Sequence, residues 1–105
     1  MKPELKILIL EDELLDAELI QRFIKKNGIQ FIADIASNKE EFLKCISENE
    51  YDVILADNSL PQFNSFEALK IVKEHHKELP FILVTGSVSE EFAVKIMQFG
   101  ADDYI

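Results

Sequence analysis

The chain has 105 residues, 11 of them basic and 20 acidic, so its formal net charge is −9. This length fits one domain with a single core. An excess of acidic residues disfavours binding to the phosphate backbone of nucleic acids and to an anionic membrane surface. Hydrophobic residues make up 48% and charged residues 30%, a balance that is typical of a folded globular domain rather than a disordered chain.

The compartment is suggested by what the sequence lacks. One cysteine, Cys45, excludes a disulfide within the chain and is typical of a reducing environment. The longest apolar runs, such as residues 7–10 and 81–84, are far shorter than the ~20 residues that cross a bilayer. Residues 1–4 lack the apolar stretch and small-residue cleavage site of a signal peptide. We therefore expect a cytoplasmic domain.

Short apolar runs alternate with segments of helical spacing. The expected strands are residues 5–10, 31–35, 53–56 and 81–84, with Tyr104 and Ile105 at the start of a fifth. Apolar runs of this length predict strands that are buried on both faces of a parallel sheet.

Four helices are expected between these strands. The first carries an apolar stripe formed by Leu15, Leu19, Ile20, Phe23 and Ile24, and Gly28 marks its end. A capping box of Ser37 and Glu40 opens the second, which carries Phe42, Leu43 and Ile46. Phe66, Leu69 and Val72 mark the third, and Ser87 with Glu90 caps the fourth. The alternation predicts right-handed βαβ units around a helix-covered parallel sheet.

Acidic and hydroxyl side chains follow three of the expected strands. Sites in an open α/β sheet form beyond the carboxyl ends of its strands, so these residues are candidates for function. The candidates after the first, third and fourth strands are Glu11, Asp12 and Glu13; Asp57, Asn58, Ser59, Leu60 and Pro61; and Thr85, Gly86 and Ser87.

The first of these loops indicates a cation site rather than a phosphate cradle. A nucleotide-binding α/β domain has a glycine-rich loop there, whereas this chain has three carboxylates. Clustered carboxylates are stabilised by a cation between them, and oxygen ligands alone favour Mg²⁺ or Mn²⁺ over zinc. Asp57 adds another strand-end carboxylate to this cluster. Such an ion also neutralises an incoming phosphoryl group, which one of the carboxylates can accept as an aspartyl-phosphate. The plainer alternative is that Asp12 or Glu13 only caps the following helix.

These motifs resemble the receiver domain of two-component response regulators. The matching segments are ILILEDE, DVILADNSLP, LPFILVTGS and FGADDYI, and their spacing agrees along essentially the whole chain. The resemblance implies a flavodoxin-like (CheY-like), doubly wound parallel sheet of five strands in the order 2-1-3-4-5.

The resemblance also implies a role for each matching residue. Asp57 is then the phosphoacceptor, and Mg²⁺ is bound by Glu11, Asp12, Asp57 and the backbone carbonyl of Ser59. Thr85 and Tyr104 link phosphorylation to a conformational change, while Ser59 and Ser87 tune dephosphorylation. A histidine kinase or a histidine phosphotransfer protein supplies the phosphoryl group, and an output domain, fused or separate, receives the signal. Homodimerisation stays open.

The chain departs from the family pattern in two places. Ser65 stands where the family usually has a glycine after the acceptor loop. The family's lysine, about three residues beyond Tyr104, and the fifth helix are both absent from the 105 residues. We therefore expect residues 1–105 to be a receiver domain truncated just after the start of the fifth strand. If the chain ends there, hydrogen exchange around Tyr104 is expected to be fast.

Three functions compete at this point. The leading one is a phosphorylation-driven signalling switch that catalyses only its own phosphorylation and dephosphorylation, and so is no conventional enzyme. A receiver-like interaction module that does not use phosphorylation is the alternative. A phosphatase with an aspartate nucleophile is disfavoured, because Ser59 stands where that class needs a second aspartate as general acid.

Overall fold

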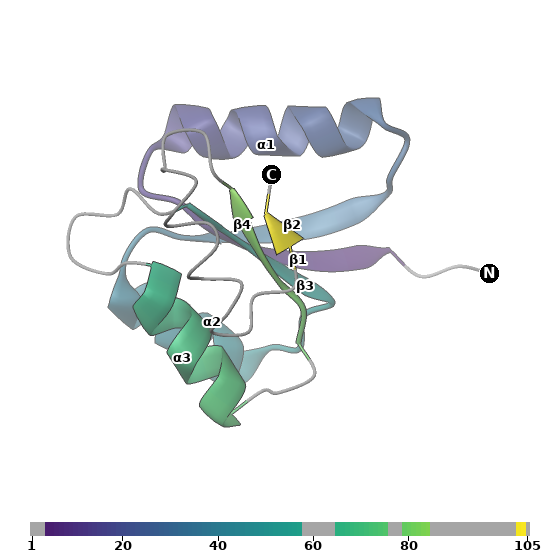
Figure 1. Cartoon of the computed structure of the whole chain (residues 1–105). Helices are drawn as coiled ribbons and strands as arrows, with labels where there is room; N and C mark the ends of the chain where they lie inside the picture. Colours follow the sequence, from purple (N-terminus) through teal and green to yellow (C-terminus); the bar gives the residue numbers. More distant parts are fainter. Residues whose placement is uncertain (1–3, 58–64, 76–78, 85–102, 105) are drawn as a thin grey trace.

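The computed structural model describes residues 4–57, 65–75, 79–84 and 103–104. Figure 1 shows the strands as a twisted sheet with helices on both faces. In chain order, the elements within these ranges are β1 (Leu5–Leu10), α1 (Leu14–Lys26), β2 (Phe31–Ala36), α2 (Lys39–Glu48), β3 (Val53–Asp57), α3 (Ser65–His75), β4 (Phe81–Val84) and β5 (Asp103–Tyr104). The fourth helix that we expected after Ser87 lies outside the described residues.

The strands form one sheet in the order β2-β1-β3-β4-β5, and all neighbours are parallel. This confirms the predicted topology. Leu10 pairs with Ala36 on one side and with Ala56 on the other, so β1, β2 and β3 reach the same edge together. Strands β2 and β3 each continue one residue beyond the predicted end, and β5 begins one residue earlier than expected.

Alternate residues of the sheet supply two separate cores. Leu8 and Leu10 of β1 face α2 and α3, whereas Ile7 and Ile9 face α1, and all four side chains are buried. Figure 1 shows α2 and α3 together on one face and α1 on the opposite face. Burial on both faces explains why the strands read as continuous apolar runs rather than as alternating ones.

Helix α1 packs on the sheet through a narrower surface than its apolar stripe predicted. Ala17 is fully buried, and Ile20 and Ile24 pack beside it. Leu15, Leu19 and Phe23, by contrast, are 68%, 52% and 64% exposed, so their assignment to the packed stripe was wrong. Residues 15, 19 and 23 lie one row further round the helix than residues 20 and 24. The small side chain of Ala17 lets the helix approach the sheet along the other edge of the stripe. Leu43 of α2 is likewise 40% exposed, so it does not share the buried face of Phe42 and Ile46.

The end of α1 follows the predicted signal. Asn27 is the C-cap residue, and its side-chain Nδ2 donates to the carbonyl of Phe23 at 2.8 Å. Gly28 has φ +80°, a conformation that glycine adopts without steric cost, and its N–H donates to the Lys25 carbonyl at 3.0 Å. This turn reverses the chain into β2.

The N-terminus of α2 is capped one residue later than the sequence suggested. Asn38, not Ser37, is the N-cap residue, and its Oδ1 accepts the N–H of Glu41 at 2.9 Å. The carboxylate of Glu41, rather than that of Glu40, reaches back and accepts both the N–H and the hydroxyl of Ser37 at 2.7 Å. The capping box therefore exists in a shifted register. Asparagine and serine are about equally good N-cap residues, so the sequence alone does not choose between the two positions.

A polar cluster ties β1 to β3 and α2 at the amino ends of the strands. The N–H of Lys6 donates to Asp52 Oδ2, and the N–H of Asp52 donates to the Lys6 carbonyl, both at 2.7 Å. The Lys6 ammonium donates to Asn49 Oδ1 at 3.2 Å and lies 5.5 Å from the centre of the Tyr51 ring. The hydroxyl of Tyr51 donates to Asp34 Oδ2 of β2 at 2.7 Å. Nothing in the sequence pattern pointed to this cluster.

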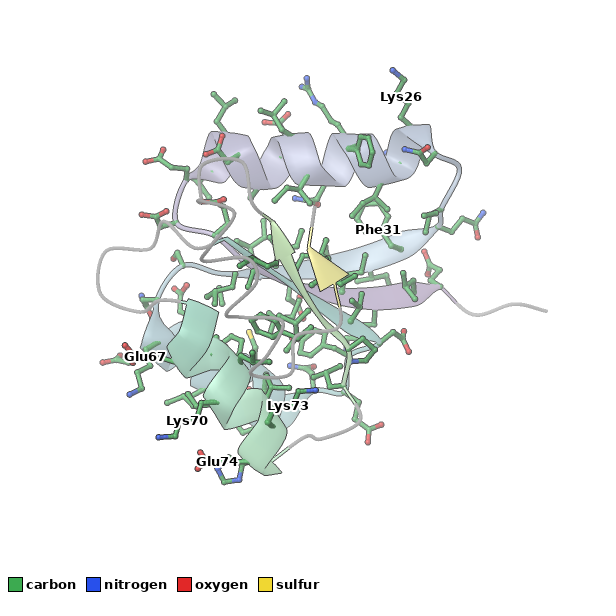
Figure 2. All side chains as sticks on the ribbon, viewed as in Figure 1. Lys26, Phe31, Glu67, Lys70, Lys73 and Glu74 are labelled. Atoms are coloured by element: carbon green, nitrogen blue, oxygen red, sulfur yellow. The ribbon has the colours of Figure 1, made fainter. Side chains whose placement is uncertain are left out.

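Helix α3 turns its polar face away from the sheet. Leu69 and Val72 are buried against the sheet. Figure 2 shows Glu67, Lys70 and Glu74 on the exposed side of the helix, whereas the half-buried Lys73 lies at its other flank. Within the described ranges, the helices are too short and too polar to cross a bilayer.

The bond between Tyr51 and Asp34 gives the first testable prediction. Tyr51→Phe removes the donor from a half-buried carboxylate, and we expect it to lower the free energy of unfolding by about 1–2 kcal/mol in urea titrations at neutral pH. Burial, and then the bond to Asp34, raises the pKa of Tyr51 above its ordinary value. The native state therefore favours the neutral phenol. The contribution should be complete below about pH 10 and lost as the pH rises further. Equal stability of the two proteins at pH 7 would contradict this.

The shifted cap of α2 gives a second prediction, at acidic pH. The two bonds from Ser37, the backbone one first, lower the pKa of Glu41. A lowered native pKa stabilises the fold above the pKa of the unfolded chain, and the effect is lost as the pH falls through the native pKa. The difference in unfolding free energy between wild type and Glu41→Gln should therefore be constant above about pH 5 and shrink below about pH 4. Glu40→Gln removes the same charge from the neighbouring residue and is the control. An equal pH dependence in Glu40→Gln would refute the assignment of the effect to Glu41.

Candidate metal and phosphoacceptor site

The candidate site begins at the carboxyl end of β1, where Glu11 leaves the sheet. Its N–H donates to the carbonyl of Ala36 at 3.0 Å, which extends the pairing of β1 with β2 by one residue. Glu11 is only 2% exposed, and it is the one buried acidic residue among those whose burial the structure describes. Carboxylates are rarely buried without partners. Glu11 Oε2 accepts the N–H of Glu13 at 3.1 Å, which fixes the carboxylate beside the start of α1.

The same bond decides between two interpretations of Glu13. We considered that Glu13 only caps the following helix. Glu13 does occupy the N-cap position of α1, but its side chain makes no capping hydrogen bond. Its main-chain N–H instead binds Glu11, and its carbonyl accepts from Ala17 at 3.0 Å. Glu13 therefore acts on the site through its backbone. Sequence reasoning missed this role, although an acid two residues before a helix N-cap is a usable signal for it.

Sheet register brings Asp57 to the same edge. Leu10 pairs with Ala56, so Glu11 and Asp57 are the next residues of two neighbouring parallel strands. Asp57 is the last residue of β3 and pairs with Val84, the last residue of β4. The backbone thus places Glu11, Asp12 and Asp57 at one edge. The side chain of Asp57 lies outside what the structure describes.

The other predicted site residues lie partly inside and partly outside the described residues. Thr85 directly follows Val84, and Thr85, Ser59 and Ser87 lie outside the described residues. Tyr104 lies in β5, where its backbone pairs with Leu83 of β4. The pairing brings the Tyr104 backbone to the strand that leads into Thr85. The proposed role of the Tyr104 side chain stays a prediction.

The donor set at this edge fits a hard divalent cation. Glu11 and Asp12 offer carboxylate oxygens, Asp12 is half-buried, and neither histidine nor cysteine belongs to the set. Side chains within the described ranges do not by themselves form a cluster of three or more metal-binding groups. A third carboxylate is expected from Asp57. Oxygen ligands of this type suit Mg²⁺ or Mn²⁺.

A ligand role for Asp12 predicts a specific loss of stabilisation by Mg²⁺. At about ten times its dissociation constant, a bound ion stabilises the native state by about 1.4 kcal/mol, which raises the melting temperature. Asp12→Asn should remove most of that increase while leaving the metal-free protein at least as stable, because one of several like charges is gone. Asp16→Asn removes a charge from an exposed site in the first turn of α1 and is the matched control. Equal Mg²⁺-induced shifts in the two variants would exclude Asp12 as a ligand.

Comparison with known proteins decides the family. The model of the response regulator receiver domain matches residues 7–105. The chain belongs to the response regulator receiver domain family. Its relatives include the transcriptional regulatory protein CusR of Escherichia coli, 31% identical over 96% of this chain, and DltR of Streptococcus agalactiae, 34% identical over 96%. The hybrid signal transduction histidine kinase G of Dictyostelium discoideum is 32% identical over 97% of the chain.

This receiver spans only part of those relatives. It covers 44% of CusR, 44% of DltR and 3% of the hybrid kinase. Receiver domains similar to this one thus occur both in transcriptional regulators and in a hybrid kinase. The related proteins therefore differ in their overall domain architecture.

Solved receiver structures agree with the fold. The receiver domain of the Francisella response regulator 1452 is 29% identical and superposes with a TM-score of 0.81, covering 97% of this chain and 83% of that one. The response regulator TrrA of Thermotoga maritima, solved in complex with Mg²⁺ and BeF, is 26% identical with a TM-score of 0.81, covering 96% and 84%. The doubly wound receiver fold is therefore confirmed.

Proposed function

We propose that this receiver is a phosphorylation-dependent switch that accepts a phosphoryl group on Asp57 with the help of Mg²⁺. The observation that carries the proposal is the register of β1 and β3, which brings Glu11 and Asp57 to one edge of the sheet. The complex of the related TrrA with Mg²⁺ and BeF supports the same choice of ion.

Each residue of this edge has a distinct part in the proposal. Asp12 and Asp57 bind the ion through carboxylate oxygens, with the backbone carbonyl of Ser59 as a further ligand. The buried Glu11, oriented by the N–H of Glu13, adds negative charge behind them and favours cation binding. When bound, the ion neutralises the charge of the phosphoryl oxygens. Mn²⁺, with the same preference for oxygen, is an expected substitute.

Transfer leaves a phosphoryl group on a carboxylate oxygen of Asp57, and the donor's leaving group departs with the electrons of the broken bond. Thr85 follows β4 directly and is proposed to donate a hydrogen bond to a phosphoryl oxygen. Tyr104 of β5 is proposed to change its rotamer in response, and Ser59 and Ser87 to set the rate of hydrolysis. The receiver thus catalyses only its own phosphorylation and dephosphorylation.

The partners in this proposal are a histidine kinase or a histidine phosphotransfer protein on the donor side, and an output domain on the other. The curated relatives include transcriptional regulators and hybrid kinases, so both architectures are open for the whole protein. A cytoplasmic location belongs to the proposal, because the phosphoryl donors of this signalling chemistry act there.

The experiment uses acetyl phosphate with Mg²⁺ and intact-mass spectrometry. Wild type should gain the mass of one phosphoryl group, Asp57→Ala should gain none, and removal of Mg²⁺ with a chelator should abolish the gain. Asp52→Ala, at the opposite end of β3, is the control and should be labelled like wild type. Equal labelling of wild type and Asp57→Ala would refute the assignment.

The same samples separate the two alternatives. A phosphorylation-independent interaction module would show neither labelling nor Mg²⁺ binding while still capturing a partner. An aspartate-nucleophile phosphatase would turn over a simple phosphomonoester repeatedly. Position 59 is serine rather than a second aspartate, so such turnover is not expected.

A further inference from the structure

Strand β2 forms one edge of the sheet, at the opposite end from β5. The carbonyls of Gln30 and Ala36 accept hydrogen bonds from β1 residues. Main-chain groups alternate in direction along a strand, so those of Phe31, Ala33 and Ile35 point outward, away from β1. An edge of this kind is a template for pairing with another strand.

The edge lacks the side chains that usually prevent such pairing. Strand β2 reads FIADIA, with no proline or lysine and one charged residue. That residue, Asp34, is held by the hydroxyl of Tyr51 at 2.7 Å. Ile32 of the strand and Ile29 just before it are 51% and 44% exposed. Natural edges are commonly protected by charges, prolines or bulges, and β2 has little of this protection.

Helix α1 extends the same surface with a symmetric pattern of charge. An open groove of about 800 Å³ separates α1 from β2, and its lining includes Glu18, Gln21, Arg22 and Lys25 on the helix and Phe31 and Ala33 on the strand. Figure 2 shows the Phe31 ring pointing from β2 toward α1. Within one copy, the Arg22 guanidinium donates to Glu18 Oε1 at 2.7 Å. When two copies of the helix meet about a two-fold axis between residues 21 and 22, Lys25 of each also faces Glu18 of the other and adds a second cation to that pair. A two-fold interface requires this self-complementarity.

The strand and the helix share one position for that axis. Residues 18 and 25 are separated by about 10.5 Å along a helix, and residues 31 and 35 by about 13 Å along a strand. Gln21 and Arg22 line the same groove as Ala33, the middle of the outward-facing residues of β2. A two-fold axis at Ala33 therefore pairs Phe31 with Ile35 of the second copy and also brings Glu18 opposite Lys25.

We propose that two copies of this chain associate through antiparallel pairing of their β2 edges, with reciprocal contacts between Glu18 and Lys25 across the two-fold axis. The two sheets then form one continuous sheet. The phosphoacceptor lies on β3, two strands away from the paired edge. The association needs neither Mg²⁺ nor phosphorylation, so its test is independent of the proposed function.

Charge exchange on unphosphorylated protein provides the test. Sedimentation equilibrium of the 105-residue chain should show a monomer–dimer equilibrium. Glu18→Lys and Lys25→Glu should each weaken it at least about tenfold, because each change places like charges opposite one another twice. An equimolar mixture of the two variants restores both attractive pairs, so it should dimerise to within about threefold of wild type. Circular dichroism establishes that each variant is folded.

A backbone variant tests the strand pairing separately. Ala33→Pro removes an outward-facing N–H, and proline is tolerated on an edge strand in that orientation. We expect the folded variant to be monomeric. The proposal is overturned if the wild type stays monomeric up to millimolar concentration, if Ala33→Pro dimerises like wild type, or if mixing the two charge variants restores nothing.

Discussion

The parallel pairing of β1 with both β2 and β3 is the constraint on which the rest of the molecule depends. Because β1 lies between β2 and β3, each of its faces packs against one of the two cores, and its residues from Ile7 to Leu10 are all buried. Its register with β3 also sets which residues leave the sheet side by side. A shift of one residue would turn every side chain of the strand to the opposite face and would separate Glu11 from Asp57.

Much of this arrangement is readable from the sequence, because strands buried on both faces leave a strong signal. Apolar runs marked β1 and β4, and the acidic residues after β1 and β3 marked the edge that carries the candidate site. The details that could not be read depend on a choice between equivalent neighbours. Periodicity shows that α1 is amphipathic, but it does not reveal that Ala17 lets the helix pack on Ile20 and Ile24 rather than on Leu19 and Phe23.

The cap of α2 shows the same limit. Ser37 and Asn38 are adjacent and both suit an N-cap, and so are Glu40 and Glu41, which both suit the reciprocal position. Tertiary position selects Asn38 and Glu41, because the chain leaves β2 at Ala36 and needs two residues before the helix begins. The bond from the Glu13 N–H to Glu11 was missed for a different reason, since the sequence reasoning considered only the side chain of Glu13 and not its main-chain N–H.

The reciprocal bonds between Lys6 and Asp52 have a consequence for how the chain assembles. They join residues 46 positions apart, near the beginning of β1. The pairing of β1 with β2 needs only about the first third of the chain, but β1 acquires its second neighbour only after β3 has emerged from the ribosome. Until then, one edge of β1, whose residues Ile7 to Leu10 are all buried in the native fold, stays unpaired. Closing a loop of this length costs entropy before any contact compensates for it. Arrival of β3 is therefore the step at which the second edge of β1 is no longer available for pairing with another chain.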